Sequence, residues 1–194
     1  MKTRILSILI ILAFCFSLVA VVAPPLANPV RAATTWYVNP GESIQAAVDG
    51  ASSGDTIIVR EGTYTENVDV NKDHLTIKSE NGAEATIVQA ANPDDDVFWV
   101  KANYVEISGF TVTGTNTFLH AGISASGEHL TICRNYALLN FAGIYVNATM
   151  NSLICNNTIT DNGAGAGGAG IEVWNSANNR ILNNNLRNNI YQAV

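Results

Sequence analysis

The chain contains few basic residues, histidines and cysteines, and each shortage narrows the range of functions that the chain can have. Ten lysines and arginines stand against sixteen aspartates and glutamates, which gives a formal net charge of −6 at pH 7. An acidic protein repels the phosphates of nucleic acids, so we expect no nucleic-acid partner. The histidines show neither metal-ligand spacing nor the pattern of a catalytic triad, and we interpret all three as turn residues: His74, His120 and His129.

An apolar run distinguishes the first 32 residues from the rest. Lys2 and Arg4 precede an uncharged stretch over residues 5–23, prolines follow, and small residues around Ala32 offer a cleavage site. This order is typical of a secretory signal peptide, although the run is also long enough for an uncleaved N-terminal anchor. In both cases we expect residues 33–194 outside the cytoplasm, secreted or at the cell surface, with no transmembrane segment left after cleavage.

Internal repeats organise residues 33–194. The segments 121–124, 142–145 and 169–172 share Ala-Gly-Ile, and an Asn-rich stretch follows each of them. Apolar residues recur at intervals of 21 to 30 residues, and the intervals of the separate columns lengthen and shorten together. The three columns are Ile77, Ile107, Ile132, Ile154 and Ile181; Val68, Phe98, Ile123, Ile144 and Ile171; and Val70, Val100, Ala125, Val146 and Val173.

These repeats predict strands rather than helices. Apolar residues alternate within each unit, which indicates a strand with one buried face, and the units are too short to carry a helical crossover each. We therefore predict an all-β fold, a right-handed parallel β-helix (solenoid), in which each strand pairs with its counterpart one coil away. Asn135, Asn157 and Asn184 are expected to form a hydrogen-bonded ladder at one turn.

The two ends of the predicted solenoid differ. Residues 43–51 read as a short helix that caps the N-terminal end, because an open end would expose strand edges. Residues 190–194 resemble the opening strand of a further coil. We expect a C-terminally truncated array, or an end that a partner or a second copy covers through end-to-end self-association.

Three motifs near the N-terminal end carry a family resemblance. Residues 43–48 (SIQAAV), 54–57 (GDTI) and 62–68 (GTYTENV) resemble the first coil of pectin-lyase-like β-helix proteins and of NosD-like proteins. The later coils resemble the PbH1 repeats of carbohydrate-binding and sugar-hydrolysing β-helices. The resemblance implies a surface setting and a polysaccharide partner, but it does not identify an activity, because this architecture hosts enzymes and adhesins alike.

Residues between the buried positions point outward and form one exposed face. Its first column is Asp69, Trp99, Ser124, Tyr145 and Glu172, with Tyr191 as a further member, and its second is Asn71, Lys101, Ser126, Asn147 and Trp174. Aromatic rings stack on sugars and polar neighbours bind hydroxyls, so this face is a candidate glycan-binding strip. The alternative is that loops or a partner shield aromatics that strands merely favour, in which case the chain is a structural or display module. The six candidate residues are Trp99, Lys101, Tyr145, Asn147, Glu172 and Trp174.

We name no catalytic residue. Asp69 and Glu172 lie four coils apart in the predicted register, ~19 Å, whereas glycoside hydrolysis needs two carboxyl groups ~5–9.5 Å apart. The enzyme alternative is a polysaccharide lyase or glycoside hydrolase whose site lies on coils beyond this sequence. A cluster of Asp94, Asp95 and Asp96, with Glu66 one coil below, is a candidate calcium site or a solvated turn. We expect no other cofactor.

The two cysteines outside the apolar leader fall in register on adjacent coils. Cys133 and Cys155 are therefore expected within disulfide distance, and export favours oxidation. Parallel side chains in register keep their Cβ atoms apart, so two stacked thiols remain the alternative.

Overall fold

The computed structural model describes residues 31–163 and 167–191, and the β-helix occupies one compact unit, residues 33–194. The predicted signal peptide or anchor, apart from Arg31 and Ala32, lies outside the described residues. Within them, no helix is long and apolar enough to cross a membrane.

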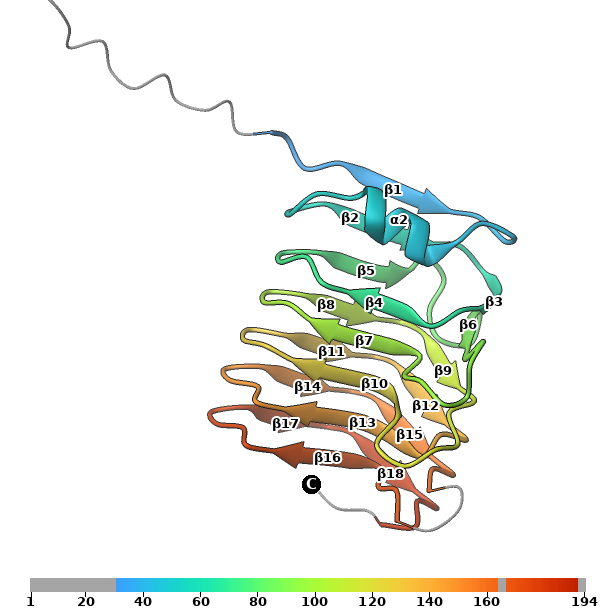
Figure 1. Cartoon of the computed structure of the whole chain (residues 1–194), viewed down its shortest axis with the longest axis vertical. Coiled ribbons are helices and arrows are strands. Elements are labelled where there is room, and N and C mark those ends of the chain that lie inside the picture. The colour runs from blue at the N-terminus through green and yellow to red at the C-terminus, as the bar shows by residue number, and fades with distance from the viewer. Residues whose placement is uncertain (1–30, 164–166, 192–194) are drawn as a thin grey trace, which may run out of the picture. The chain divides into compact units, whose positions relative to one another are not determined.

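The described chain is a right-handed parallel β-helix of three sheets (Figure 1). Sheet 1 comprises β1 (Thr35–Val38), β2 (Thr56–Val59), β5 (Thr76–Ser79), β8 (Glu106–Ser108), β11 (Thr131–Cys133), β14 (Leu153–Cys155) and β17 (Arg180–Leu182). Sheet 2 comprises β3 (Gly62–Thr65), β6 (Thr86–Gln89), β9 (Thr111–Thr113), β12 (Tyr136–Leu138), β15 (Thr158–Thr160) and β18 (Asn185–Arg187). Sheet 3 comprises β4 (Val68–Val70), β7 (Phe98–Lys101), β10 (Ala121–Ser126), β13 (Ala142–Asn147) and β16 (Ile171–Trp174).

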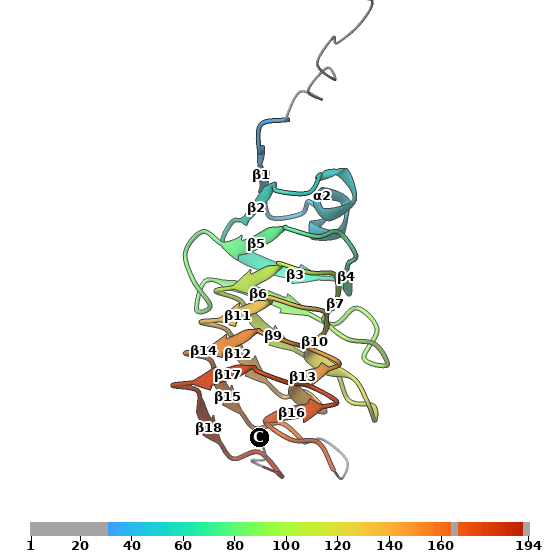
Figure 2. The same ribbon diagram turned by 90° about the vertical axis from the view of Figure 1, so that its left-hand side faces the viewer.

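From β2 to β16 each coil contributes one strand to sheets 1, 2 and 3 in turn, as the side view shows (Figure 2). All strand pairs are parallel, and their register confirms the three predicted apolar columns. Ile107, for example, lies between Ile77 and Ile132, and all three are buried. Stacked apolar side chains thus fill the interior and hold successive coils together.

Two asparagine ladders fix two of the corners. The predicted one joins sheets 1 and 2, where Asn157 Oδ1 accepts from the backbone N–H of Asn135 and Asn184 Oδ1 accepts from that of Asn157. The preceding residue has a left-handed backbone, for example Asn156 with φ 53°. A second ladder, which the sequence reasoning missed, joins sheets 2 and 3 through Asn140, Asn162 and Asn189.

Helix α2 (Ile44–Gly50) is the predicted helix at the N-terminal end of the solenoid. Ser43 caps it by accepting a hydrogen bond from the N–H of Ala46, and its apolar side buries Ile44 and Val48. Lys72 lies at the other end of the helix and donates to the carbonyls of Val48, Asp49 and Ala51. A cation at this end also suits the helix dipole.

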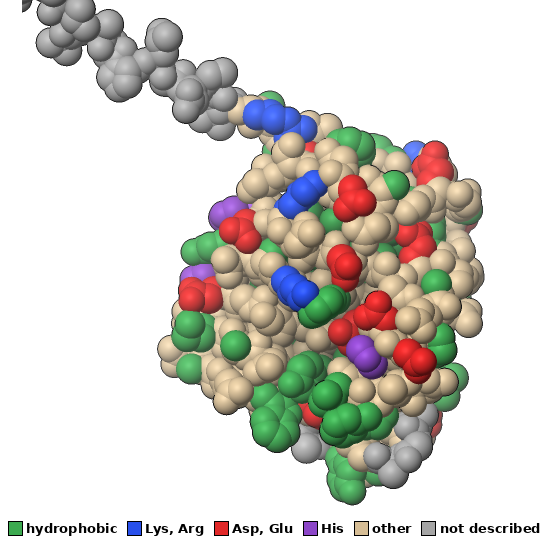
Figure 3. Space-filling model, viewed as in Figure 1, with side chains coloured by type: hydrophobic (Ala, Val, Ile, Leu, Met, Phe, Trp, Pro, Cys, Tyr) green, Lys and Arg blue, Asp and Glu red, His purple; other side chains and the backbone are tan. Residues whose placement is uncertain are grey.

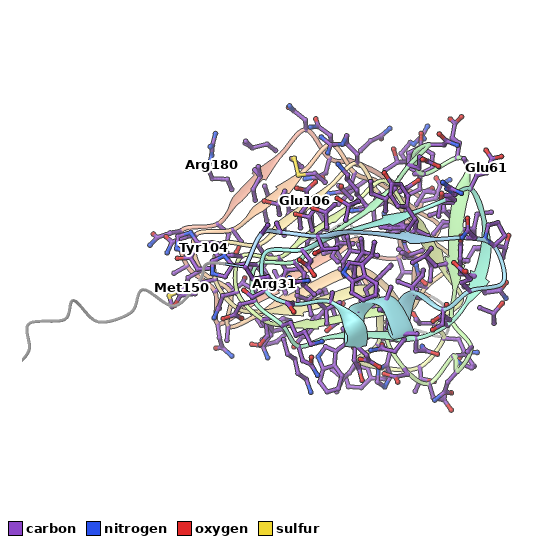
Figure 4. All side chains as sticks on the ribbon, turned by 90° about the horizontal axis from the view of Figure 1, so that it is seen from above. Arg31, Glu61, Tyr104, Glu106, Met150 and Arg180 are labelled. Carbon is purple, nitrogen blue, oxygen red and sulfur yellow. A yellow bond between two sulfur atoms is a disulfide. The ribbon has the colours of Figure 1, made fainter. Side chains whose placement is uncertain are left out.

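The outer side of sheet 1 carries the disulfide. Cys133 and Cys155 pair in register with Cα atoms 4.6 Å apart and are joined by a disulfide bond, the first of the two alternatives for these thiols. Viewed along the stack, Glu106 and Arg180 point outward from this sheet, and Tyr104 and Met150 lie at the corner that leads into it from sheet 3 (Figure 4).

Candidate functional site

The outer face of sheet 3 carries the six residues of the candidate strip. Trp99, Ser124, Tyr145 and Glu172 follow one another in register across β7, β10, β13 and β16. Asn147 pairs with Trp174 in the neighbouring column. Tyr191 does not extend the first column, because it pairs with Ala169 rather than Glu172. We call the six residues the sheet 3 strip: Trp99, Lys101, Tyr145, Asn147, Glu172 and Trp174.

Two adjoining pockets lie along this strip. The polar pocket, about 400 Å³, is lined by residues that include Asp95, Asp96, Trp99, Lys101, His120, Tyr145 and Asn147. The apolar pocket, about 350 Å³, is lined by Phe118, Leu119, Phe141, Ala142, Tyr145, Gly167, Glu172 and Trp174. Tyr145 and Leu119 belong to both pockets. Every strip residue therefore lines at least one of two neighbouring hollows.

An enlarged corner between sheets 2 and 3 builds the wall of the apolar pocket. Residues 114–120 connect β9 to β10, whereas the next coil makes the same connection with residues 139–141. The longer loop places Phe118 against the edge of Phe141, with ring centroids 5.6 Å apart and planes at 81°. Sequence reasoning missed these residues, although the consecutive Phe118 and Leu119 in a polar loop were a usable signal.

The two tryptophans of the strip differ in how open their rings are. Lys101 Nζ lies 2.9 Å from the centroid of the Trp99 ring, so an ammonium group covers one face of that indole. Trp174 carries no such cover among the described residues and is 57% exposed, against 37% for Trp99. Trp174 is therefore the more accessible platform for a planar or ring-shaped ligand.

A group able to hold a metal lies at the edge of the polar pocket. The ligand atoms of Asp95, Asp96 and His120 all fall within 4.8 Å of one another. His120 Nδ1 lies 3.7 Å from Asp96 Oδ1 and is buried, with no hydrogen-bond partner in the part of the chain that the structure describes. An imidazole with two carboxylates suits zinc-like ions better than calcium, which prefers oxygen ligands alone.

Asp96 is the most perturbed acid of this group. Its side chain is only 8% exposed, and its Oδ1 accepts a hydrogen bond of 2.6 Å from the N–H of Ala121. Burial raises the pKa of Asp96 to about 6, and the hydrogen bond from Ala121 and the nearby His120 oppose this rise. Asp96 can therefore exchange a proton near neutral pH.

Glu66 and Asp94, the other two calcium candidates, have other partners. The Glu66 carboxylate accepts from the N–H groups of Ile44 and Gln45, at 2.9 and 3.1 Å, and so binds the first turn of α2. Asp94 accepts a hydrogen bond from the Thr117 hydroxyl. The structure thus brings Asp95 and Asp96 together with His120, a residue that the sequence reasoning assigned to a turn.

Comparison with known sequences finds a partial relative. No protein-family model matches this sequence. A cell surface glycoprotein from Methanothermus fervidus is 44% identical over 73 residues, which are 37% of this chain and 12% of that protein. The aligned stretch therefore spans only a small part of that relative's length.

Solved structures show the same fold at low identity. An alginate lyase from Paenibacillus sp. str. FPU-7 superposes with a TM-score of 0.70 at 19% identity, over 79% of this chain and 58% of that one. Pectate lyase Pel9A gives 0.66 at 17% identity, over 80% and 48%. A pectin methylesterase in complex with a hexasaccharide gives 0.54 at 12% identity, over 80% and 67%. The chain has the pectin-lyase-like β-helix fold.

Proposed function

We propose that this chain is a β-helix module of a cell-surface protein and that it binds glycan along the sheet 3 strip. The observation that carries the proposal is that the residues predicted from the sequence lie at pockets on the surface of the structure. Strand alternation places these six residues on one outward face, their aromatic and polar side chains suit sugars, and all six line two adjoining pockets. Such hollows, with aromatic walls and a few polar groups, are the usual form of a ligand site.

The chemistry of the strip suits sugars. The open indole of Trp174 and the phenol of Tyr145 offer apolar surfaces for the C–H faces of sugar rings, while Asn147 and Lys101 offer donors to hydroxyl groups. In the space-filling view of this face, acidic side chains and a histidine gather beside a patch of hydrophobic side chains (Figure 3). A strip with both apolar and polar side chains can bind the C–H faces and the hydroxyl groups of a sugar chain.

Two comparisons support the setting. The partial relative is itself a cell surface glycoprotein, and one structural neighbour was solved with a hexasaccharide bound. We carry both features to this chain only as parts of the proposal.

Calorimetric titration with a panel of oligosaccharides tests the proposal. Trp174→Ala should weaken binding about 2- to 12-fold, because a favourable aromatic contact contributes ~0.5–1.5 kcal/mol. Tyr37→Ala is the matched control, since Tyr37 is a similarly exposed aromatic (52%) on β1, in a different sheet. Absence of binding to every glycan, or equal losses in both variants, would refute glycan binding at the strip.

A second candidate function is polysaccharide cleavage, which the group of Asp95, Asp96 and His120 favours. A carboxyl group whose pKa is about 6 can act as a general acid or base near neutral pH. Incubation with alginate, pectate and neutral polysaccharides, with and without added zinc or calcium, should then release unsaturated or reducing ends. Wild-type activity that Asp96→Asn abolishes would support cleavage, and no release under any condition would reject it.

A further inference from the structure

Negative charge predominates along the two pockets. Asp95, Asp96 and Glu172 contribute carboxyl groups to their lining, and Lys101 is the one lysine or arginine among the described lining residues. The ammonium group of Lys101 already rests on the Trp99 ring. A bound anionic group would therefore face several carboxylates with little compensating positive charge.

This charge distribution disfavours polyuronates. Alginate and pectate carry one carboxylate on nearly every sugar, so a chain lying along the strip would place like charges beside Asp95 and Glu172. Juxtaposed like charges at a partly desolvated interface oppose binding and serve to reject wrong partners. The fold is shared with an alginate lyase and a pectate lyase, but the strip lacks a set of basic residues suited to such ligands.

The apolar pocket suggests what the strip accepts instead. Its walls include the Phe118 and Phe141 rings, Tyr145 and Trp174, and they can enclose a small apolar group such as a methyl. Glu172 lies in the same wall, half-buried, and its Oε1 accepts a bond of 3.2 Å from the N–H of Ala169. Its second oxygen has no donor among the described residues. A half-buried carboxylate oxygen next to an apolar hollow calls for a ligand with both a donor and an apolar group.

An acetamido substituent has both features, because its N–H can donate to Glu172 while its methyl group packs against the aromatic walls. We infer that the strip selects neutral, N-acetylated sugars over polyuronates, with the acetamido group seated in the apolar pocket. This inference rests on the glycan-binding function proposed above and names its ligand class.

Titration with three tetrasaccharides separates the possibilities: tetra-N-acetylchitotetraose, cellotetraose and tetragalacturonate. Each is measured at 150 mM salt, once with EDTA and once with added calcium, because a bridging cation could recruit a uronate. The N-acetylated oligomer should bind at least tenfold more tightly than the other two in both buffers. Equal binding of cellotetraose, or tighter binding of tetragalacturonate in either buffer, would overturn the inference and leave glycan binding intact. Absence of binding by all three would overturn the inference, and absence of binding across the whole oligosaccharide panel would overturn glycan binding as well.

A charge-neutral variant tests the role of Glu172. Glu172→Gln should weaken binding of the N-acetylated oligomer about tenfold and narrow its advantage over tetragalacturonate. Glu84→Gln is the matched control, because Glu84 is an exposed carboxylate in a separate groove near β5 and β6. Equal effects of the two variants, or no effect of Glu172→Gln, would contradict the assignment of the apolar pocket. Circular dichroism verifies that both variants keep the fold.

Discussion

Removing one rung of an asparagine ladder should destabilise the whole solenoid. Asn157 is 1% exposed, and its side chain makes four hydrogen bonds. Its Oδ1 accepts from the backbone and side-chain N–H groups of Asn135, at 2.9 and 3.3 Å. Its Nδ2 donates to the carbonyl of Ile132 and to Asn184 Oδ1, both at 2.9 Å.

Asn157→Ala deletes all four of these bonds at a buried site. At ~1 kcal/mol for each net hydrogen bond, the expected loss in the free energy of unfolding is about 4 kcal/mol, and unsatisfied backbone groups push it upward. Urea denaturation followed by circular dichroism measures this loss. The control is Asn81→Ala, because the exposed Asn81 side chain makes one bond, to Glu61, and should cost ~0.5 kcal/mol or less. A cost below about 1 kcal/mol for Asn157→Ala, or one equal to the control, would refute a structural role for the ladder.

Three further perturbations test other parts of the structure. Burial raises the pKa of Asp96 from about 3.8 to about 6, so the folded state holds this proton more tightly than the unfolded chain. The stability that protonated Asp96 provides is full below about pH 4 and is lost as pH rises through about 6, a change of at most about 3 kcal/mol. Asp96→Asn should flatten this dependence in urea midpoints at pH 4 and 7.5, and equal slopes would contradict it. Gly143→Ala should lower the free energy of unfolding by about 2 kcal/mol, because a Cβ there would lie 2.5 Å from Ile159 Cγ2 and 2.6 Å from the carbonyl oxygen of Gly170. An unchanged melting temperature would contradict this expectation and show that the neighbouring coil can shift to make room. Reduction of the Cys133–Cys155 disulfide, whose cysteines are 22 residues apart, should lower the free energy of unfolding by about 3 kcal/mol. The loss is measured as a lower urea midpoint in the presence of dithiothreitol. The Cys133→Ala, Cys155→Ala double variant should be insensitive to the reductant.

The sequence predicted the interior well because the interior is periodic. Ile107, Ile132 and Ile154 stack as expected, since each coil must present an apolar residue at the same place to pair with its neighbours. The same periodicity placed Cys133 beside Cys155 and located the outward positions of the strip.

Features outside the repeat were harder to predict. The register places Glu66 one coil below Asp96, but its carboxylate turns to the N-terminus of α2, where three hydrogen-bond donors meet it. His120 reaches Asp96 because the N–H of Ala121, the next residue, bonds to that carboxylate. Such contacts depend on the path of irregular loops, which no column of repeats specifies.

Because of Thr115, the enlarged corner between sheets 2 and 3 should tolerate changes in its loop sequence. Its N–H donates to Asn140 Oδ1 and its hydroxyl accepts from the N–H of Phe141, so it takes the position that an asparagine holds in the following coils. Residues 116–120 follow that position, where the next coil has the single residue Phe141, so the enlargement of this corner begins only after the ladder position is filled. New sequences could therefore be grafted between Thr115 and Ala121 without breaking the scaffold beneath them. This corner is where a lineage, or a protein engineer, could exchange ligand preference while retaining the same stack of coils.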